Sequence, residues 1–119
     1  MKRFLLSLLT LVTLSGAVSA QTKAVQTAKI STPTIQCDMC KKKIETYLNR
    51  YDGISSINVN VKRKEVTVKY LTDRINEEEI KTAIANAGYD AAEIPANEDS
   101  YKRLPKCCKK PVDGGGMKD

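Results

Sequence analysis

Apolar and polar residues alternate most regularly in the middle of the chain, where two short runs repeat with a period of two. The apolar positions of these runs are Ile57, Val59, Val61, Val66, Val68 and Tyr70. Because successive side chains of a strand point to opposite faces, each run predicts a strand with one buried face and one face in water. The basic residues Arg63 and Lys64 lie between the runs and predict a tight turn, so the two strands should form a β-hairpin.

Apolar residues on either side of this hairpin recur at steps of three and four, which is the period of an amphipathic helix. The first helix has the apolar residues Ile44, Tyr47, Leu48 and Tyr51, and the second has Ile80, Ala83, Ile84 and Ala87. Gly53 and Gly88 follow these stretches and predict the helix ends. Asn76 is a suitable N-cap for the second helix, and the glutamates after it lie where the helix dipole favours negative charge.

Two further strands are predicted at the ends of this region. Residues 23–35 alternate around Ala28 and Ile30, and Pro33 excludes a helix through them. Residues 89–94 follow the second helix, and we expect them to form a short last strand. The order β-α-β-β-α-β predicts an α+β fold of the ferredoxin-like type, with a four-stranded antiparallel sheet and two helices on one face.

Residues 1–20 have the composition of a secretory signal peptide. Lys2 and Arg3 precede an apolar run over residues 4–14, and the small residues of a cleavage site end at Ala20. This run is about half as long as the roughly 20 residues that a membrane-spanning helix needs, so we expect cleavage rather than anchoring. The mature protein is therefore expected in the periplasm, without a membrane-spanning segment.

The length and the charge of the remaining chain limit how many domains it can form and which partners it can bind. Residues 21–95 suffice for one small domain, and the tail, residues 96–119, has a possible short helix over residues 98–104 and a glycine run typical of disorder. The full chain has a net charge of +6, with basic and acidic residues interspersed. A nucleic-acid-binding protein would cluster its basic residues with exposed aromatics, so we expect no nucleic-acid partner, and we expect a monomer.

The candidate chemistry lies at the junction between the first strand and the first helix, where Cys37 and Cys40 are separated by two residues. The positive end of the helix and the lysines that begin at Lys41 favour thiolates, which are the form that binds metal. The chain contains no histidine, so two thiolates suit monovalent copper or mercury better than zinc. The same pair can instead form a disulfide.

Together these features resemble the heavy-metal-associated domain family. The residues that carry the resemblance are Cys37, Cys40, Ile44, Glu45, Leu48, Gly53, Ile54, Ala83, Ile84, Gly88 and Tyr89. The resemblance covers residues 29–94, and the family includes copper chaperones, modules of metal-pumping ATPases and periplasmic mercury-binding proteins, the last of which are nearest in organisation. It implies a metal-binding domain that is not an enzyme and that delivers its ion to a metal-transporting membrane protein or another acceptor.

The resemblance also implies roles for the residues around the motif cysteines, which would themselves be the metal ligands. Tyr89 would pack near the metal loop, and Ile35 stands where the family usually buries a methionine beneath that loop. Family positions between the two cysteines usually point to solvent, so we expect Met39 to cover the site rather than to bind the ion. Lys41 opens a charge run that is either a solvated face or a docking site for an acidic partner.

A second pair of thiols, Cys107 and Cys108, lies in the tail outside the family region. Lysines flank this pair on both sides and favour thiolates. The chain after Ile94 is long enough, at about 3.3 Å per residue, to fold back along the domain. The pair could complete a four-sulfur site, hold its own metal, form a disulfide with Cys37 or Cys40, or have no role. Of these alternatives we predict a part in metal handling.

The resulting hypothesis is an exported protein that captures Cu(I), or alternatively Hg(II), on Cys37 and Cys40 and passes it to a partner by ligand exchange. Zn(II) fits this site less well. Two other functions stay open: a thiol–disulfide oxidoreductase, and an interaction module whose cysteines are oxidised. The oxidoreductase is disfavoured because a thioredoxin fold begins with a parallel βαβ unit and needs a proline opposite its cysteines, whereas a hairpin lies in the middle of the order predicted here.

Overall fold

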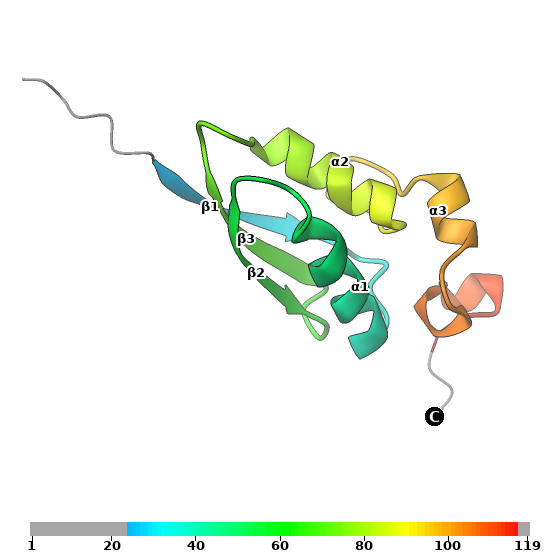
Figure 1. The fold of residues 1–119 in the computed structure, drawn as a ribbon. Coiled ribbons are helices and arrows are strands. Elements are labelled where there is room, and N and C mark those ends of the chain that lie inside the picture. The colour runs from blue at the N-terminus through cyan, green and yellow to red at the C-terminus, as the bar shows by residue number, and fades with distance from the viewer. Residues whose placement is uncertain (1–23, 117–119) are drawn as a thin grey trace, which may run out of the picture.

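The computed structural model describes residues 24–116 (Figure 1). Its elements are β1 (Val25–Ser31), α1 (Asp38–Leu48), β2 (Ile54–Asn60), β3 (Glu65–Leu71), α2 (Glu77–Ala87), α3 (Glu98–Lys102) and the 3₁₀ turns η1 (Lys106–Cys108) and η2 (Pro111–Asp113). The first five confirm the predicted strands and helices in their predicted order. The predicted signal peptide lies outside the described residues. No helix within residues 24–116 is long and apolar enough to cross a membrane.

The sheet has three strands in the order β1-β3-β2, and both neighbours of β3 run antiparallel to it. In the central strand, Val66 lies opposite Ile30 on one side and opposite Val59 on the other. These three side chains are buried, whereas the residues between them along the strands are exposed or half-buried. The prediction of a hairpin with one wet face is therefore confirmed.

Both long helices pack on the buried face of this sheet (Figure 1). Helix α1 contributes Ile44 and Leu48 to the core, α2 contributes Ile80 and Ile84, and all four side chains are fully buried. The helical period read from the sequence thus identifies the core-facing side of each helix. Because Cys37 and Cys40 belong to the same buried cluster, the core also positions both ends of the cysteine motif.

The predicted fourth strand is not formed. Ala91 and Ile94 exchange two backbone hydrogen bonds of 2.9 Å, and Ala92 between them has a positive φ of 51°. One further bond of 2.8 Å joins the Ala92 N–H to the Ser31 carbonyl at the end of β1. Because the segment turns back and bonds to itself, its N–H and C=O groups cannot form a ladder along β1. The fold keeps the expected arrangement of two helices on one face of an antiparallel sheet, and that sheet has three strands.

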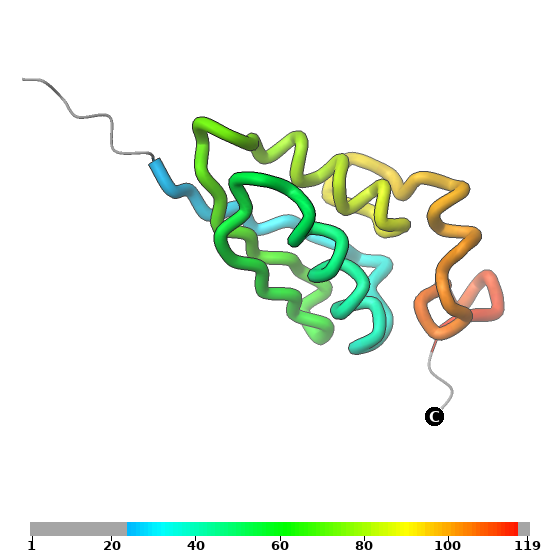
Figure 2. The backbone as a smooth tube through the Cα atoms, in the orientation of Figure 1, coloured from blue at the N-terminus to red at the C-terminus, as the bar shows by residue number. Residues whose placement is uncertain are grey.

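The tail after α2 folds against the domain. Its short helix, predicted over residues 98–104, is observed as α3. Leu104 follows this helix, is buried, and packs against Gly88 at the end of α2. Figure 2 shows the chain continuing from α2 through α3 and then passing toward the start of α1. This path brings η1 into contact with α1.

The last described residues form a small network of hydrogen bonds around Tyr101. Its hydroxyl accepts from the Lys110 N–H at 2.9 Å and also bonds the carboxylate of Asp113. Where the glycine run predicted disorder, the described backbone turns back, and the Gly116 N–H donates to the Lys106 carbonyl at 3.3 Å. These bonds link the two 3₁₀ turns to α3, so the cysteines of η1 are carried by a folded segment.

Candidate metal centre

The start of α1 positions Cys37 and Cys40. Cys37 is the residue before the helix and has an extended backbone, with φ −154° and ψ 175°, whereas Cys40 lies in the first turn. A side chain at the N-cap and one three positions later lie on the same side of a helix start, as in a capping box. The two Sγ atoms are accordingly 3.5 Å apart. The N–H groups of the first turn give this point a positive potential that favours thiolates.

The loop before the motif is buried and tied to its surroundings. Ile35 is fully buried in the cluster that contains both motif cysteines, and its N–H donates to the Thr32 carbonyl at 3.1 Å. The hydroxyl of Thr34 accepts from the Asp90 N–H at 3.0 Å, which joins the metal loop to the turn after α2. The sequence did not predict this bond, because a threonine in a loop carries no signal of its partner.

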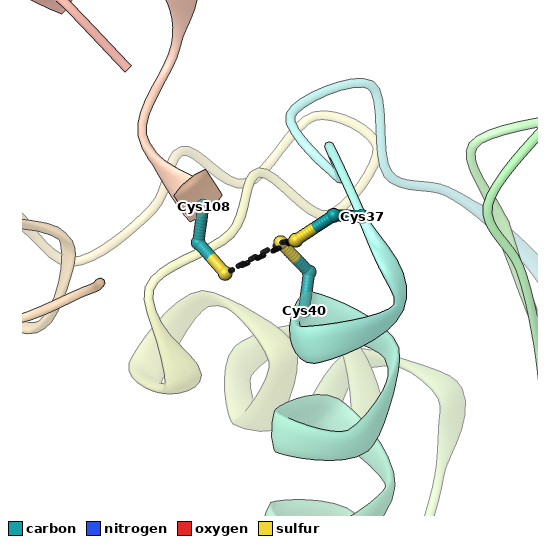
Figure 3. A group of neighbouring side chains, drawn as sticks. All are labelled: Cys37, Cys40 and Cys108. Atoms are coloured by element: carbon teal, nitrogen blue, oxygen red, sulfur yellow. Dashed lines mark hydrogen bonds between the residues drawn. The ribbon is translucent and has the colours of Figure 1, made fainter. Parts of the chain in front are cut away.

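A third sulfur reaches the motif from the tail. The Sγ of Cys108 lies 2.6 Å from that of Cys40 and 3.9 Å from that of Cys37, and the side chain is fully buried (Figure 3). The three sulfurs all lie within 4.8 Å of one another. They come from the residue before α1, from its first turn and from η1. All three are free thiols. The structure therefore brings one of the two tail cysteines to the predicted site.

The other tail cysteine lies at the edge of this cluster. Cys107 is half-buried, and its Sγ is 4.0 Å from that of Cys108 and 3.6 Å from the Sδ of Met39. Its carbonyl accepts a weak hydrogen bond from the Cys37 thiol at 3.7 Å. Met39 itself is 53% exposed. Met39 thus lies partly exposed beside the cluster, and its contact with a tail cysteine is a feature that only the folded chain reveals.

The thiols differ in how readily they ionise. Burial acts to raise the pKa of Cys37, but hydrogen bonds from the backbone and thiol of Cys40 outweigh it and lower that pKa below its ordinary value. Burial raises the pKa of Cys108 well above its ordinary value, and the thiol of Cys40 adds to the rise. The pKa of Cys107 is raised above its ordinary value, mainly by a hydrogen bond with Cys37 and to a smaller extent by burial. A cation at the centre of the cluster would favour the ionised form of every thiol that faces it.

Tyr89 closes the inner side of the site. Its side chain is fully buried, and within residues 24–116 its hydroxyl has no hydrogen-bond partner of ordinary geometry. Burial raises the pKa of Tyr89 far above its ordinary value, and the thiols of Cys108 and Cys40 add to the rise because they lie beside the hydroxyl. An unpartnered buried hydroxyl costs about 1–3 kcal/mol. Thiolate sulfurs at these two cysteines would supply the missing acceptor.

The outer side of the site is basic. Lys41 follows Cys40 in α1 and is half-buried. A surface groove runs along the same helix from Met39, and the residues that line it are Met39, Lys42, Lys43, Thr46, Tyr47 and Arg50. The guanidinium of Arg50 lies over the Tyr47 ring, 5.7 Å from its centroid. Two lysines of the charge run, Lys42 and Lys43, therefore line a shallow surface groove along α1 that begins at Met39, whereas Lys41 lies outside it.

The chemistry of this donor set is that of a soft-metal site. All the converging donors are sulfur atoms, and the chain has no histidine to add a nitrogen. Thiolate donors select Cu(I), Hg(II) and Zn(II) among common metal ions, and low coordination numbers favour the first two over zinc. The residues present thus fit a monovalent copper or a mercuric ion as cargo.

Comparison with known proteins agrees with this site. Residues 29–90, just over half of the chain, match the model of the heavy-metal-associated domain. The chain belongs to the heavy-metal-associated domain family. The match begins in β1 and ends after α2, so the domain contains the motif, both long helices and the sheet, whereas η1 and its cysteines lie outside the matched residues.

Several relatives of this heavy-metal-associated domain have assigned names. A copper-exporting P-type ATPase of Staphylococcus aureus is 30% identical over 80 residues, which are 67% of this chain and 10% of the ATPase. The copper chaperone CopZ of Bacillus subtilis is 34% identical over 58 residues, which are 49% of this chain and 84% of the chaperone. The chain thus spans a tenth of the length of the ATPase and most of the chaperone.

A solved structure extends the comparison to mercury. The mercury-bound form of MerP, the periplasmic protein from the bacterial mercury detoxification system, is 25% identical with a TM-score of 0.51. The match covers 58% of this chain and 96% of MerP. The heavy-metal-associated domain described here therefore shares its fold with a protein that binds mercury and shares sequence with proteins named for copper.

Proposed function

We propose that this heavy-metal-associated domain is an exported carrier of a soft metal ion, Cu(I) in the first place and Hg(II) in the second. The observation that carries the proposal is the buried Cys37–Cys40 pair, whose sulfurs are 3.5 Å apart at the start of α1. Two thiolates at this separation can chelate one ion. The relatives support the choice of metal, since they include a copper-exporting ATPase, a copper chaperone and a mercury-bound protein.

Capture and release are ligand exchange without electron transfer. When the ion binds, each ligand thiol loses its proton to solvent and becomes a thiolate. During release, a thiolate of the acceptor binds the ion, and a thiolate of the domain leaves it and takes up a proton. The function is therefore binding and delivery, and it requires no enzymatic step.

The proposed acceptor is a metal-transporting membrane protein, or another thiol-bearing protein, with an acidic docking face. The basic groove beside the site supports this choice, because Lys42, Lys43 and Arg50 complement negative charge. Replacement of both Lys42 and Lys43 by glutamate should slow delivery to such an acceptor when both proteins are fully loaded with Cu(I) beforehand. Equal delivery rates for both proteins, measured at low ionic strength, would rule out this docking face.

Export is proposed from the signal-peptide pattern of residues 1–20. In bacteria that produce the full chain with a C-terminal tag, the protein should be recovered from the periplasmic fraction with Gln21 as its first residue. N-terminal sequencing of the purified protein checks this expectation. A chain that keeps Met1 and stays with the cytoplasmic fraction would show that the carrier works inside the cell.

The binding proposal is tested on reduced, oxygen-free protein that begins at Gln21. Competition with a Cu(I) chelator should give one ion per chain. Cys37→Ser and Cys40→Ser should each weaken binding by about a hundredfold, or about 2.7 kcal/mol, because the preformed motif pair at the start of α1 is lost. The exposed Ser56→Ala serves as a matched surface control and should bind as the wild type does. Wild-type affinity in either cysteine variant would exclude that cysteine as a ligand.

A further inference from the structure

We propose that Cys108 is the third ligand of the metal, so that the C-terminal tail completes the site and closes it. The proposal rests on the function proposed above, since it concerns the same ion. It adds a three-thiolate site made by two distant parts of the chain, because Cys40 and Cys108 are 68 positions apart in sequence. The cysteine that completes it lies beyond residues 29–90, which match the family.

The separations of the sulfurs suit a three-coordinate ion. At a metal–sulfur distance of about 2.3 Å, three sulfurs around one ion lie about 4 Å apart. Cys37 and Cys108 already have this separation, at 3.9 Å, and Cys37 and Cys40 are close to it, at 3.5 Å. The pair Cys40 and Cys108, at 2.6 Å, must move apart when the ion enters. Thus an ion needs the Cys40 and Cys108 sulfurs to separate by about 1.4 Å, which side-chain rotation can supply while the backbone stays in place.

Cys107 does not complete a fourth position. The group of sulfurs that lie within 4.8 Å of one another consists of Cys37, Cys40 and Cys108. Cys107 contacts Met39 instead. The four-sulfur site that the sequence left open is therefore replaced by a site of three sulfurs with a separate pair beside it.

The tail presents Cys108 through a defined support. Leu104 is buried against Gly88, and the following 3₁₀ turn is closed by a bond of 2.9 Å from the Cys108 N–H to the Pro105 carbonyl. After this turn, the Lys110 N–H donates a hydrogen bond of 2.9 Å to the hydroxyl of Tyr101. If Cys108 only filled space in the core, an apolar side chain would serve equally well at its position. Its sulfur would then have no reason to lie close to two other sulfurs.

A second observation points to a ligand at the same place. The hydroxyl of Tyr89 is buried without a hydrogen-bond partner in the described residues, and it lies beside Cys40 and Cys108. When an ion replaces the protons of these thiols, their sulfurs become strong acceptors, and the hydroxyl can donate to one of them. Tyr89 then acts as a positioning residue for the metal-bound thiolates.

The third ligand changes how the ion leaves. The two motif thiolates alone leave an open side to an acceptor, whereas three thiolates enclose the ion until one of them is exchanged. All three cysteines lie in one buried cluster, but Cys108 is the natural leaving ligand, because a short 3₁₀ turn of the tail carries it whereas the other two lie at the start of the long helix α1. We expect the acceptor thiolate to displace Cys108 first, with the proton taken up by the leaving thiol.

The test counts sulfur ligands by X-ray absorption on reduced protein loaded with one equivalent of Cu(I). Wild type and the matched control Cys107→Ser should show three sulfurs, and Cys108→Ser should show two. Affinity for Cu(I) should fall by about tenfold in Cys108→Ser. A chain that ends at Leu104 should also show two sulfurs and the weaker affinity of Cys108→Ser. Circular dichroism checks that this shortened chain is folded.

The outcomes separate this proposal from the function on which it rests. Two sulfurs in the wild type, with unchanged values in Cys108→Ser, would overturn the third ligand and leave the motif pair as the site. Wild-type protein that binds no Cu(I) under the same conditions would overturn the proposed function itself. Tyr89→Phe should keep three sulfurs and change the charge-transfer absorption of the Hg(II) form, which a purely structural role would not alter.

A separate observation supports a second pair of soft ligands, Met39 and Cys107, on the solvent-exposed edge of the thiol cluster. Met39 is exposed, and its thioether sulfur contacts the thiol of Cys107 at 3.6 Å. We infer that this pair binds Cu(I) transiently on its way to the buried thiols, since both donors are soft and Cys107 is 4.0 Å from Cys108. Entry needs only ligand exchange, and the proton of Cys107 returns when the ion moves on.

The variants Met39→Leu and Cys107→Ser test this pair by stopped-flow loading from a Cu(I) chelate. Each should slow loading about threefold to tenfold at unchanged equilibrium affinity, and the double variant should be no slower than the slower single variant. The exposed Ser56→Ala is the control, because Ser56 lies on β2 outside both the site and the basic groove, and it should load at the wild-type rate. Loading at the wild-type rate in both single variants would exclude the pair as an entry station.

Discussion

The two cysteine pairs of this chain arrange their sulfurs in opposite ways. Cys37 and Cys40 are three positions apart at a helix start, and their sulfurs lie 3.5 Å apart on one side of it. Cys107 and Cys108 are adjacent, and their sulfurs have different neighbours, Met39 for the first and Cys40 for the second. Adjacent residues direct their side chains to different sides, whereas residues three apart on a helix share a side. Two cysteines three positions apart can therefore chelate one ion by themselves, whereas two adjacent cysteines place their sulfurs against different neighbours.

The pairs differ also in what holds them. Cys40 is part of the core formed by α1, α2 and the sheet, so the motif is as stable as the domain. Cys108 is buried in the same cluster, but it reaches it from the tail, and its position depends on Leu104, on the 3₁₀ turn and on the bonds around Tyr101. This contrast suggests that the motif supplies affinity and that the tail regulates access, and the predictions below test that division.

The largest effect should come from a comparison of double variants. Cys37→Ser with Cys40→Ser should abolish measurable Cu(I) binding, a loss of about a thousandfold or more, because the remaining Cys108 cannot chelate. Cys107→Ser with Cys108→Ser should retain the site and weaken it about tenfold. Chelator competition on reduced protein measures both. A tail variant that binds more weakly than the motif variant would reverse the division proposed here.

The next effect concerns stability in the two regions. Leu48→Ala should lower the free energy of unfolding by about 2–5 kcal/mol, because Leu48 is fully buried between α1 and the sheet. Leu104→Ala should lower it less, since the tail can detach while the domain stays folded. Denaturant titration followed by circular dichroism measures the first effect. Limited proteolysis after Leu104→Ala should cut the tail early, and cutting inside the domain at the same rate would contradict the distinction.

A smaller effect is expected at the cap of α2. Asn76 accepts from the Glu79 N–H at 2.8 Å, and the Glu79 carboxylate accepts from the Asn76 N–H at 3.0 Å. Asn76→Ala should therefore cost about 1 kcal/mol of stability. The exposed Asn58→Ala is a matched control and should change stability by less than about 0.5 kcal/mol. Cu(I) affinity should be the same in both variants, and a fall in Asn76→Ala alone would show that the site depends on this helix end.

Metal removal should have the smallest effect on the domain. The core of the sheet and helices consists mainly of apolar side chains, so the reduced apo-protein should keep its far-ultraviolet circular dichroism and its cooperative unfolding. Zinc fingers behave differently, because metal binding supplies most of their folding free energy. Hydrogen exchange should become faster only in the tail when metal is removed. A random-coil spectrum for the apo-protein would show that the scaffold is not preformed.

Several parts of this protein are determined by the sequence over short distances. The alternation around Val66 and Val68 predicts the hairpin, and the helical period around Ile44 and Ile84 predicts which sides are buried. The spacing of the motif cysteines at a helix start likewise predicts that their sulfurs converge. All these features depend on residues two to four positions apart, where strand and helix geometry is the same in any fold.

Other parts were decided by the tertiary structure alone. Residues 89–94 read as a strand, but the turn at Ala92 and the Asp90–Thr34 bond make them a tight connection instead. The choice of Cys108 over Cys107 depends on how the tail packs, and the contact with Cys40 joins residues 68 positions apart. Sequence patterns carry no record of such distances, because the free energy that brings distant sulfurs together comes from the packing of the whole chain.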